Sequence, residues 1–180
     1  TRYYAFNPLS WTRTDYCDFP YNGSKAIKVM DLTTNLEVPF QFVNDQGRQI
    51  IRILASEIPS LGYKVFEIQN GKPKPFPNAA SINGSTIEND FFKLTMTNQG
   101  VITGLIDKRN GNKEIVSQIN GEYMNDLGSG ADNSGEMILE SNGPVSVTIV
   151  AKGKSPLAHT TKITLFKAIP RIEIQNQITE

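Results

Sequence analysis

The sequence predicts an all-β protein made of two β-sandwiches. Apolar and polar residues alternate with a period of two along most of the chain, which is typical of strands that bury one face. Asn-Gly pairs, which favour tight turns, separate several of these stretches. No stretch sustains the i, i+3, i+4, i+7 spacing of an amphipathic helix. Short strands divided by such turns favour a sandwich architecture.

The alternation predicts individual strands in chain order. They cover residues 26–32, 36–42, 49–55, 63–68, 91–96, 101–106, 145–150, 161–166 and 171–178. The segment "LEVPFQF" (36–42) places Leu, Val, Phe and Phe at alternate positions, and "RIEIQNQI" (171–178) sets isoleucines against charged and amide residues. The Asn-Gly pairs at 22–23, 70–71, 110–111 and 142–143 are expected to form tight hairpin turns with positive φ angles.

One change of composition interrupts the alternating pattern. The segment "NGKPKPFPNAASING" (70–84) contains three prolines and no alternation, so it is not expected to continue a β-ladder. We therefore predict a small β-sandwich domain over residues 1–72, a linker over 73–84 and a larger β-sandwich over 85–180.

Composition excludes several classes of function. Lys plus Arg and Asp plus Glu each number 18, so the net charge is zero and no basic stripe is present to bind nucleic acid. No apolar run approaches the ~20 residues that span a bilayer, so we expect no membrane segment. Cys17 is the single cysteine, which excludes an internal disulfide and a thiolate zinc cluster. The expected location is the cytoplasm or periplasm of a bacterium.

The polar residues do not form a recognisable catalytic motif. His159 is the single histidine, and no partners at defined spacing accompany it, so a structural or solvent-exposed role is predicted. The segment 125–136 contains Asp126, Asp132 and Glu136 in a glycine-rich context, but its spacing does not match a calcium-binding loop. We predict a flexible solvated loop there, and no catalytic residue, metal site or cofactor site in this chain.

Four segments resemble a known enzyme family. They are "FNPLSWTRTDY" (6–16), "EIPSLGYKVFEI" (57–68), "ENDFFKLTMTNQGVITGLIDKRNGNKEI" (88–115), and "NGPVSVTIVAKG" together with "TKITLFKAIPRIEIQNQI" (142–153 and 161–178). Each is similar to a motif in the C-terminal β region of the family-38 glycoside hydrolases, the α-mannosidases. The segments follow one another in the family's order and cover nearly the whole chain.

The resemblance implies a specific fold. It implies a small immunoglobulin-like sandwich over about residues 1–72, followed by part of a larger galactose-mutarotase-like supersandwich that begins near Ser81. It also implies that the chain is a C-terminal piece of a larger enzyme, entered at "FNPLSW". There, Pro8 is expected to set a turn while Phe6 and Trp11 pack into the core of the first domain.

The resemblance also implies a chemistry that lies outside this chain. Family members are retaining α-mannosidases, in which an aspartate attacks the anomeric carbon and a zinc ion held by Asp and His ligands binds the mannose hydroxyls. Those residues lie N-terminal to the region that the chain resembles, so no catalytic residue is transferred to it. We expect the isolated chain to be inactive, with the N-terminal catalytic domain of the same polypeptide and a mannose-containing glycan as its partners.

The segment "NGEYMNDLGSG" (120–130) departs most from the family pattern. The loop 121–136 joins two recognisable motifs and contains Tyr123, Asn125 and Asp126, whose polar groups suit sugar hydroxyls. We hypothesise that these three residues lie near the substrate in the full enzyme, and a mobile surface loop is the alternative.

Two other classes of function are weighed. A stand-alone carbohydrate-binding sandwich should carry exposed aromatic residues aligned on one face, whereas the aromatic residues here fall mostly at core positions such as Phe40, Phe42 and Phe92. An aldose epimerase of the mutarotase fold would need a histidine and a carboxylate as acid and base, and His159 alone does not supply both.

Overall fold

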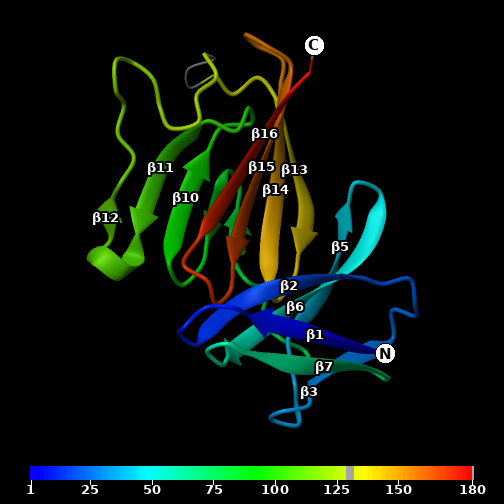
Figure 1. The fold of residues 1–180 in the computed structure, drawn as a ribbon. Coiled ribbons are helices and arrows are strands. Elements are labelled where there is room, and N and C mark those ends of the chain that lie inside the picture. The colour runs from blue at the N-terminus through cyan, green and yellow to red at the C-terminus, as the bar shows by residue number, and fades with distance from the viewer. Residues whose placement is uncertain (129–131, 180) are drawn as a thin grey trace. The chain divides into compact units, whose positions relative to one another are not determined.

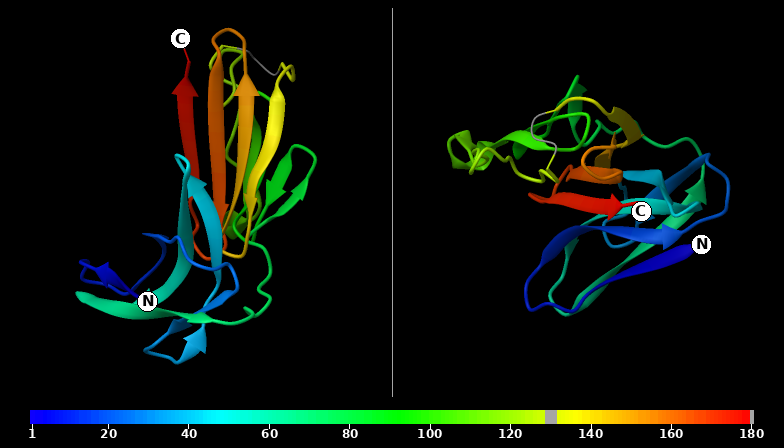
Figure 2. Two further views of the ribbon diagram at one scale, coloured as in Figure 1. Left: turned by 90° about the vertical axis from the view of Figure 1, so that its right-hand side faces the viewer. Right: turned by 90° about the horizontal axis from the view of Figure 1, so that it is seen from above.

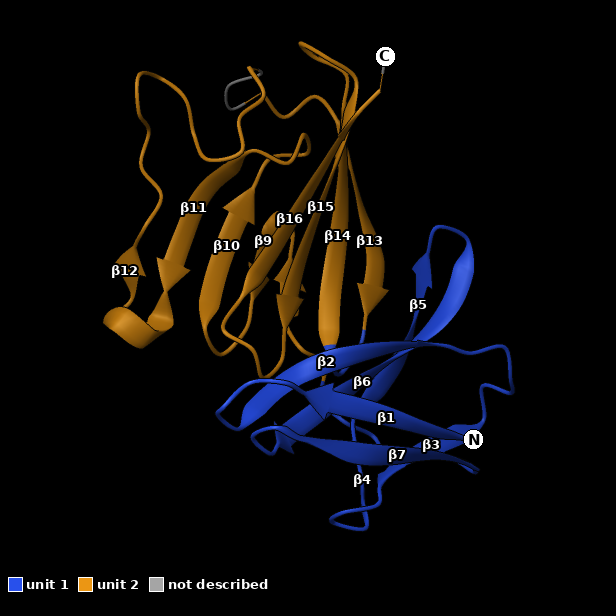
Figure 3. Cartoon of the chain, viewed as in Figure 1, with its two compact units in different colours: residues 1–77, 143–145 blue, residues 78–142, 146–180 orange. Residues whose placement is uncertain are grey.

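The computed structural model describes residues 1–128 and 132–179 and consists of strands in four antiparallel sheets (Figure 1). The all-β prediction is therefore confirmed, and the one helical element among these residues is a short 3-10 turn, η1 (Lys108–Asn110). The chain divides into two compact units (Figure 3). Unit 1 comprises residues 1–77 and 143–145, and unit 2 comprises residues 78–142 and 146–180.

Unit 1 is built from two sheets that share one core. The first sheet has the order β1 (Arg2–Asn7), β7 (Gly62–Asn70), β3 (Ile27–Asp31) and β4 (Leu36–Glu37). The second has the order β2 (Arg13–Pro20), β6 (Arg48–Ile58) and β5 (Phe40–Asp45). Ile27, Val29 and Phe66 from the first sheet pack with Ile51 and Ile53 from the second, and all five side chains are fully buried.

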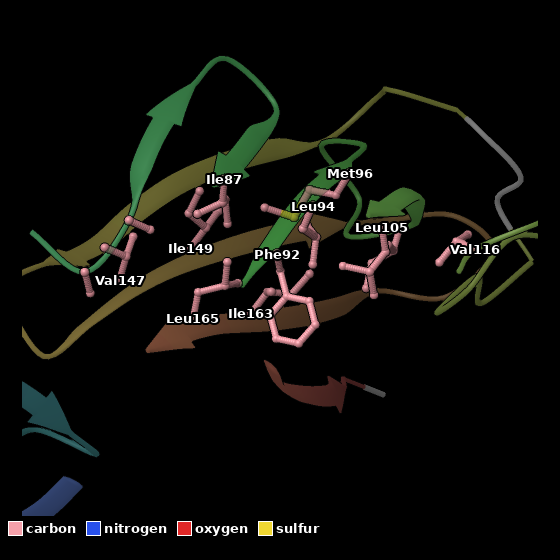
Figure 4. Close-up of a cluster of buried hydrophobic side chains, with 13 residues drawn as sticks. Ile87, Phe92, Leu94, Met96, Leu105, Val116, Val147, Ile149, Ile163 and Leu165 are labelled. Atoms are coloured by element: carbon pink, nitrogen blue, oxygen red, sulfur yellow. The ribbon is translucent and has the colours of Figure 1, made fainter. Parts of the chain in front are cut away.

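Unit 2 also has two sheets around a common core. One sheet has the order β12 (Lys113–Glu114), β11 (Ile102–Asp107), β10 (Phe92–Met96), β9 (Thr86–Glu88) and β8 (Ser81–Asn83). The other has the order β13 (Glu136–Asn142), β14 (Ser146–Gly153), β15 (His159–Phe166) and β16 (Ile172–Ile178), and its long strands lie side by side in Figure 2. Leu94 and Leu105 of the first sheet pack against Ile149, Ile163 and Leu165 of the second (Figure 4).

The segment 36–42 is not one strand, so that prediction is wrong. Pro39 divides it into β4, which pairs with β3 in the first sheet of unit 1, and β5, which pairs with β6 in the second sheet. Proline has no N–H to donate to a β-ladder, so the chain leaves one sheet and enters the other at this point. The remaining predicted strands each correspond to a strand of the structure, whereas β1, β2, β8, β9, β12 and β13 were not predicted.

The expected packing of Phe6 and Trp11 is also wrong. Phe6 is 64% exposed and Trp11 is 60% exposed, whereas Asn7 is 1% exposed. The Asn7 side chain donates to the carbonyl oxygens of Trp11 (2.7 Å) and Pro59 (3.0 Å) and accepts from the Leu9 N–H (3.1 Å). A buried amide with these partners stabilises the turn after β1, so the asparagine, rather than the aromatic rings, points inward.

The Asn-Gly pairs have different roles. Gly111 ends η1 in the left-handed region at φ 65°, whereas Asn142 ends β13 and Gly143 follows it in the hairpin to β14 without the predicted positive φ angle. The prediction of hairpins is wrong for 22–23, which lies between β2 and β3 of different sheets, and for 70–71, where Asn70 ends β7 and Gly71 leads into the segment before β8. Within the predicted linker, residues 81–83 form strand β8.

An ion pair lies inside unit 1. The Nζ atom of Lys64 is 2.8 Å from Oδ2 of Asp31, and the two side chains are 8% and 5% exposed. Burial raises the pKa of Asp31, but hydrogen bonds from Lys64 and from the Thr33 N–H more than offset it, so the pKa lies below the ordinary value. Each charge therefore depends on its partner to remain buried.

Candidate functional site

The segment 115–128 forms the candidate site, and an Asn-Gly turn within it determines its shape. Asn120 (φ 53°) and Gly121 (φ 88°) form a tight turn in which the N–H and C=O groups of Ile119 and Glu122 exchange hydrogen bonds of 2.9 and 3.0 Å. Consecutive positive φ angles are characteristic of an Asn-Gly hairpin turn. This Asn-Gly pair was not among those counted in the sequence, although the same signal would have found it.

A cavity of about 510 Å³ opens beside this turn. Its lining combines aliphatic and polar side chains: Ile115, Val116, Ser117, Ile119, Asn120, Glu122, Tyr123 and Met124. Ile115, Ile119 and Met124 are 50%, 69% and 43% exposed, so the cavity has an apolar rim. The Ile102 N–H donates to the Met124 carbonyl oxygen at 2.9 Å, which attaches the segment to β11.

The structure brings Tyr123, Asn125 and Asp126 into this one segment, but gives each a different environment. Tyr123 is half-buried, packs against the core of unit 2 and lines the cavity. Asp126 accepts a hydrogen bond from the Gly128 N–H at 2.8 Å, which closes a local turn. Residues 129–131 of the predicted loop 121–136 lie outside the described residues. Proximity to a substrate stays a prediction for all three side chains.

Asn125 connects the segment to the sheet. Its Nδ2 donates to the Gly100 carbonyl oxygen at 2.9 Å, and its Oδ1 accepts from Nδ2 of Asn176 at 2.6 Å. Asn176 in turn accepts from the hydroxyl of Thr161 at 2.7 Å. Both ends of the Asn125 amide are thus engaged within the protein, so its geometry fits a positioning role for the segment.

His159 is held inside unit 2 by backbone groups. It is 4% exposed, with Nδ1 2.8 Å from the Leu157 carbonyl oxygen and Nε2 2.9 Å from the Gln99 carbonyl oxygen. Gly153 lies against the imidazole, because a Cβ there would stand 2.2 Å from Cε1 of His159. With both ring nitrogens facing backbone carbonyls, the histidine is arranged as a structural group rather than as an acid or base.

Two further cavities lie in unit 2. One of about 600 Å³ adjoins His159 and is lined also by Glu136, Lys152 and Lys154. Another, of about 720 Å³, is lined by the ion pairs Glu88–Lys108 (2.9 Å) and Asp90–Lys167 (3.1 Å), together with Ser81 and Asn89.

Within residues 1–128 and 132–179, no three His, Cys, Asp or Glu side chains gather closely enough to hold a metal ion. No helix of the described chain is long and apolar enough to cross a membrane.

Aromatic residues gather on one outer face of unit 1. Tyr4, Phe6 and Tyr63 are 63%, 64% and 58% exposed on the neighbouring strands β1 and β7. Phe40 and Phe42 are half-buried against the core of unit 1 and Phe92 is buried in unit 2, as their positions predicted. The prediction that aromatic residues fall at core positions therefore holds for these three residues, but not for Tyr4 and Phe6 of β1 or Tyr63 of β7.

Comparison with solved structures shows where this fold has been seen. An α-mannosidase from Enterococcus faecalis V583 matches 99% of this chain and 30% of its own, with a TM-score of 0.68 and 16% sequence identity. A protein in glycosyl hydrolase family 38 from Enterococcus faecalis matches 99% of this chain and 31% of its own, with a TM-score of 0.65 and 15% identity. The resemblance predicted from the sequence segments is confirmed at the level of the fold.

The chain thus spans about 30% of the length of these two proteins. Neither the models of known protein families nor the curated protein sequences give a match.

Proposed function

We propose that this chain is the non-catalytic C-terminal β region of an α-mannosidase, which packs on the catalytic domain and helps to shape it. The observation that carries the proposal is the match of 99% of the chain to about 30% of an α-mannosidase. The four segments that resemble family-38 motifs support it independently, because they occur in the family's order. The parent enzyme would hydrolyse α-mannosidic bonds.

The proposal extends to the finer fold. Unit 1 would be the immunoglobulin-like sandwich and unit 2 a part of the mutarotase-like supersandwich. The two-sheet cores of both units support this assignment.

A zinc ion is implied for the parent enzyme, and the described residues of this chain do not fit it. Such a centre needs several Asp and His ligands, whereas the one histidine is buried with both nitrogens on backbone carbonyls. The zinc ion, the nucleophile and the acid are therefore proposed to belong to the N-terminal catalytic domain. No catalytic step is assigned to a residue of this chain.

The direct test measures hydrolysis of aryl α-mannosides. The 180-residue chain should leave them intact with or without added zinc, while the complete polypeptide that contains it should hydrolyse them. Turnover by the pure 180-residue chain would overturn the non-catalytic assignment, and a complete polypeptide without α-mannosidase activity would overturn the parent enzyme.

We further propose that Tyr123 contacts the glycan in the parent enzyme. Its position on the cavity wall and its polar hydroxyl support this role. Tyr123→Ala should lower kcat/KM by about tenfold or more, which corresponds to ~1.4 kcal/mol of transition-state stabilisation. Because the ring also packs against the core, Tyr123→Phe is the matched control: it preserves the packing and removes the hydroxyl alone.

Steady-state kinetics and a melting curve of each variant separate the two roles. A loss of kcat/KM in Tyr123→Phe at an unchanged melting temperature supports contact through the hydroxyl. Wild-type kinetics for Tyr123→Phe, combined with an unstable Tyr123→Ala variant, would show that the residue is structural.

The alternative function is a stand-alone carbohydrate-binding module. The exposed aromatic residues Tyr4, Phe6 and Tyr63 are the observation that raises it, and the tilt of 50° between the Tyr4 and Tyr63 rings counts against it. Isothermal calorimetry of the 180-residue chain with mannose oligosaccharides tests this function, and measurable binding would support it.

A further inference from the structure

The outer face of the β1–β7 pair carries exposed aromatic side chains at one end, where a solvent-exposed sheet is expected to be polar. Strand alternation places Tyr4 and Phe6 on the same side of β1, and the register sets Phe6 directly opposite Tyr63 on β7. The rings of Tyr4 and Tyr63 lie 6.1 Å apart between centroids. Figure 1 shows β1 and β7 as neighbours, and the whole of β1 pairs with β7.

The apolar surface continues into the turns at the end of this strand pair. Leu61 precedes β7, and its N–H donates to the Leu9 carbonyl oxygen at 2.9 Å, while Trp11 follows the turn that Asn7 holds. Leu61 is 69% exposed and Trp11 is 60% exposed. We name the outer surface of this strand pair the β1–β7 face; Tyr4, Phe6 and Tyr63 form it, and Leu61 and Trp11 lie in the turns at its end.

The size of the β1–β7 face indicates an interface. Side chains of this size present ~150–250 Å² each, so exposure of 58–69% amounts to roughly 500–800 Å² for the five together. Contiguous apolar patches of this order on a soluble protein mark interaction sites. The area is within the range of one side of a domain–domain interface inside a chain. The footprinting experiment below distinguishes a second copy of the chain as the occupant.

The chemistry of the face disfavours a sugar. The rings of Tyr4 and Tyr63 are tilted by 50° and do not form one flat platform. Phe6 and Leu61 have no group that could bind a sugar hydroxyl, and the nearest cross-strand ion pair, Arg2–Glu67 at 2.9 Å, lies at the other end of β1. A surface of tilted rings and aliphatic groups is complementary to another apolar protein surface.

We propose that the β1–β7 face docks against an apolar surface of the parent polypeptide outside these 180 residues, and this rests on the proposed function. The two matched proteins are about three times longer than the region that this chain covers, so in each of them a tethered partner is present. Tethering raises the effective concentration of the partner, so a face of this size suffices for stable docking.

Hydroxyl-radical footprinting read by mass spectrometry tests the docking. The peptides that carry Tyr4, Phe6 and Tyr63 should be labelled strongly in the 180-residue chain and be protected severalfold in the complete polypeptide. Leu36 is the matched control, because it is 61% exposed in unit 1 but belongs to β4, outside the β1–β7 face. Its labelling should be the same in both proteins.

A pair of variants gives a second readout. Phe6→Ser with Tyr63→Ser should leave the melting temperature of the 180-residue chain unchanged, because both side chains are solvated there. In the complete polypeptide the same substitutions should lower the melting temperature by several degrees. Leu36→Ser should have no effect in either protein.

Each other outcome overturns the docking proposal. Equal labelling of the face in both proteins shows that it stays exposed. Protection that rises with the concentration of the 180-residue chain identifies a second copy, and protection by added mannose oligosaccharides identifies a sugar platform. The α-mannosidase assay of the complete polypeptide is independent: an inactive polypeptide with a protected face would overturn the proposed function alone, and an active one with an exposed face would overturn the docking alone.

Discussion

Units 1 and 2 differ in which aromatic side chains they expose and in which polar side chains they bury. Both units bury a phenylalanine, Phe66 and Phe166, but unit 1 also exposes Tyr4 and Phe6 and buries the ion pair Asp31–Lys64. The buried polar side chains among the described residues of unit 2 are uncharged residues and His159, and they include Thr148 and Thr164, whose hydroxyls lie 2.9 Å apart. The outer surface of unit 1 thus resembles a protein interface in its exposed aromatic residues, and part of its interior depends on an ion pair. The interior of unit 2 depends on apolar packing and hydrogen bonds.

Two phenylalanines in the same sheet of unit 1 give the sharpest test of this difference. Phe66→Ala should lower the free energy of unfolding by about 3–5 kcal/mol, because the fully buried ring leaves a cavity. Phe6→Ala in the 180-residue chain should change it by no more than about 0.5 kcal/mol, because Phe6 is 64% exposed. Urea denaturation followed by circular dichroism measures both. Similar losses for the two variants would mean that the β1–β7 face is buried in the chain itself.

The buried ion pair of unit 1 can be disrupted by removing one of its two charges. Lys64→Ala should cost about 3–5 kcal/mol of unfolding free energy, because Asp31 would remain buried without its partner. Arg2→Ala removes the partner of Glu67 in an exposed pair of the same sheet and should have little effect. Urea denaturation of both variants decides the matter, and equal losses would show that the Asp31–Lys64 pair is solvated.

In unit 2 the corresponding test is steric. Gly153→Ala should lower the free energy of unfolding by about 1–3 kcal/mol, since the new Cβ would stand 2.2 Å from the His159 ring. Gly104→Ala is the control, because the nearest atom to its Cβ would be at 3.5 Å, an ordinary contact. Thermal unfolding of both variants provides the comparison. A Gly153→Ala protein as stable as Gly104→Ala would indicate that His159 moves without cost.

The smallest expected effect is the pH dependence that the buried ion pair of unit 1 contributes. The pKa of Asp31 is lowered on folding, so its contribution to stability is present above the ordinary value of 3.8 and is lost as the pH falls through the folded pKa. Asp31→Asn combined with Lys64→Met should remove this part of the acid sensitivity. Urea midpoints between pH 2 and pH 6 measure it. Other carboxyls with a lowered pKa, such as Glu88 beside Lys108, remain in both proteins and provide the background. An identical acid profile in both proteins would contradict a role for Asp31.

The candidate site could be foreseen in part. Tyr123, Asn125 and Asp126 are close in sequence, so their gathering in one segment follows from the chain itself. The hydrogen bonds of Asn125 with Gly100 and Asn176 involve residues 25 and 51 positions away. No local sequence pattern contains such pairings, so the hydrogen bonds by which Asn125 holds the segment to distant residues could not be predicted.

The sequence by itself determined the all-β class and about half of the strand positions, because alternation with a period of two is a local property of the backbone. For some strands, only the tertiary structure decided which side faces the core. In β1, both Tyr4 with Phe6 and Ala5 with Asn7 satisfy the alternation, and only packing against the second sheet of unit 1 selects Ala5 and Asn7 as the inner pair. The same holds for the sheet change at Pro39 and for the pairing of Asp31 with Lys64 across 33 residues. These features depend on partners distant in sequence, whose positions are set when the sheets close around a common core.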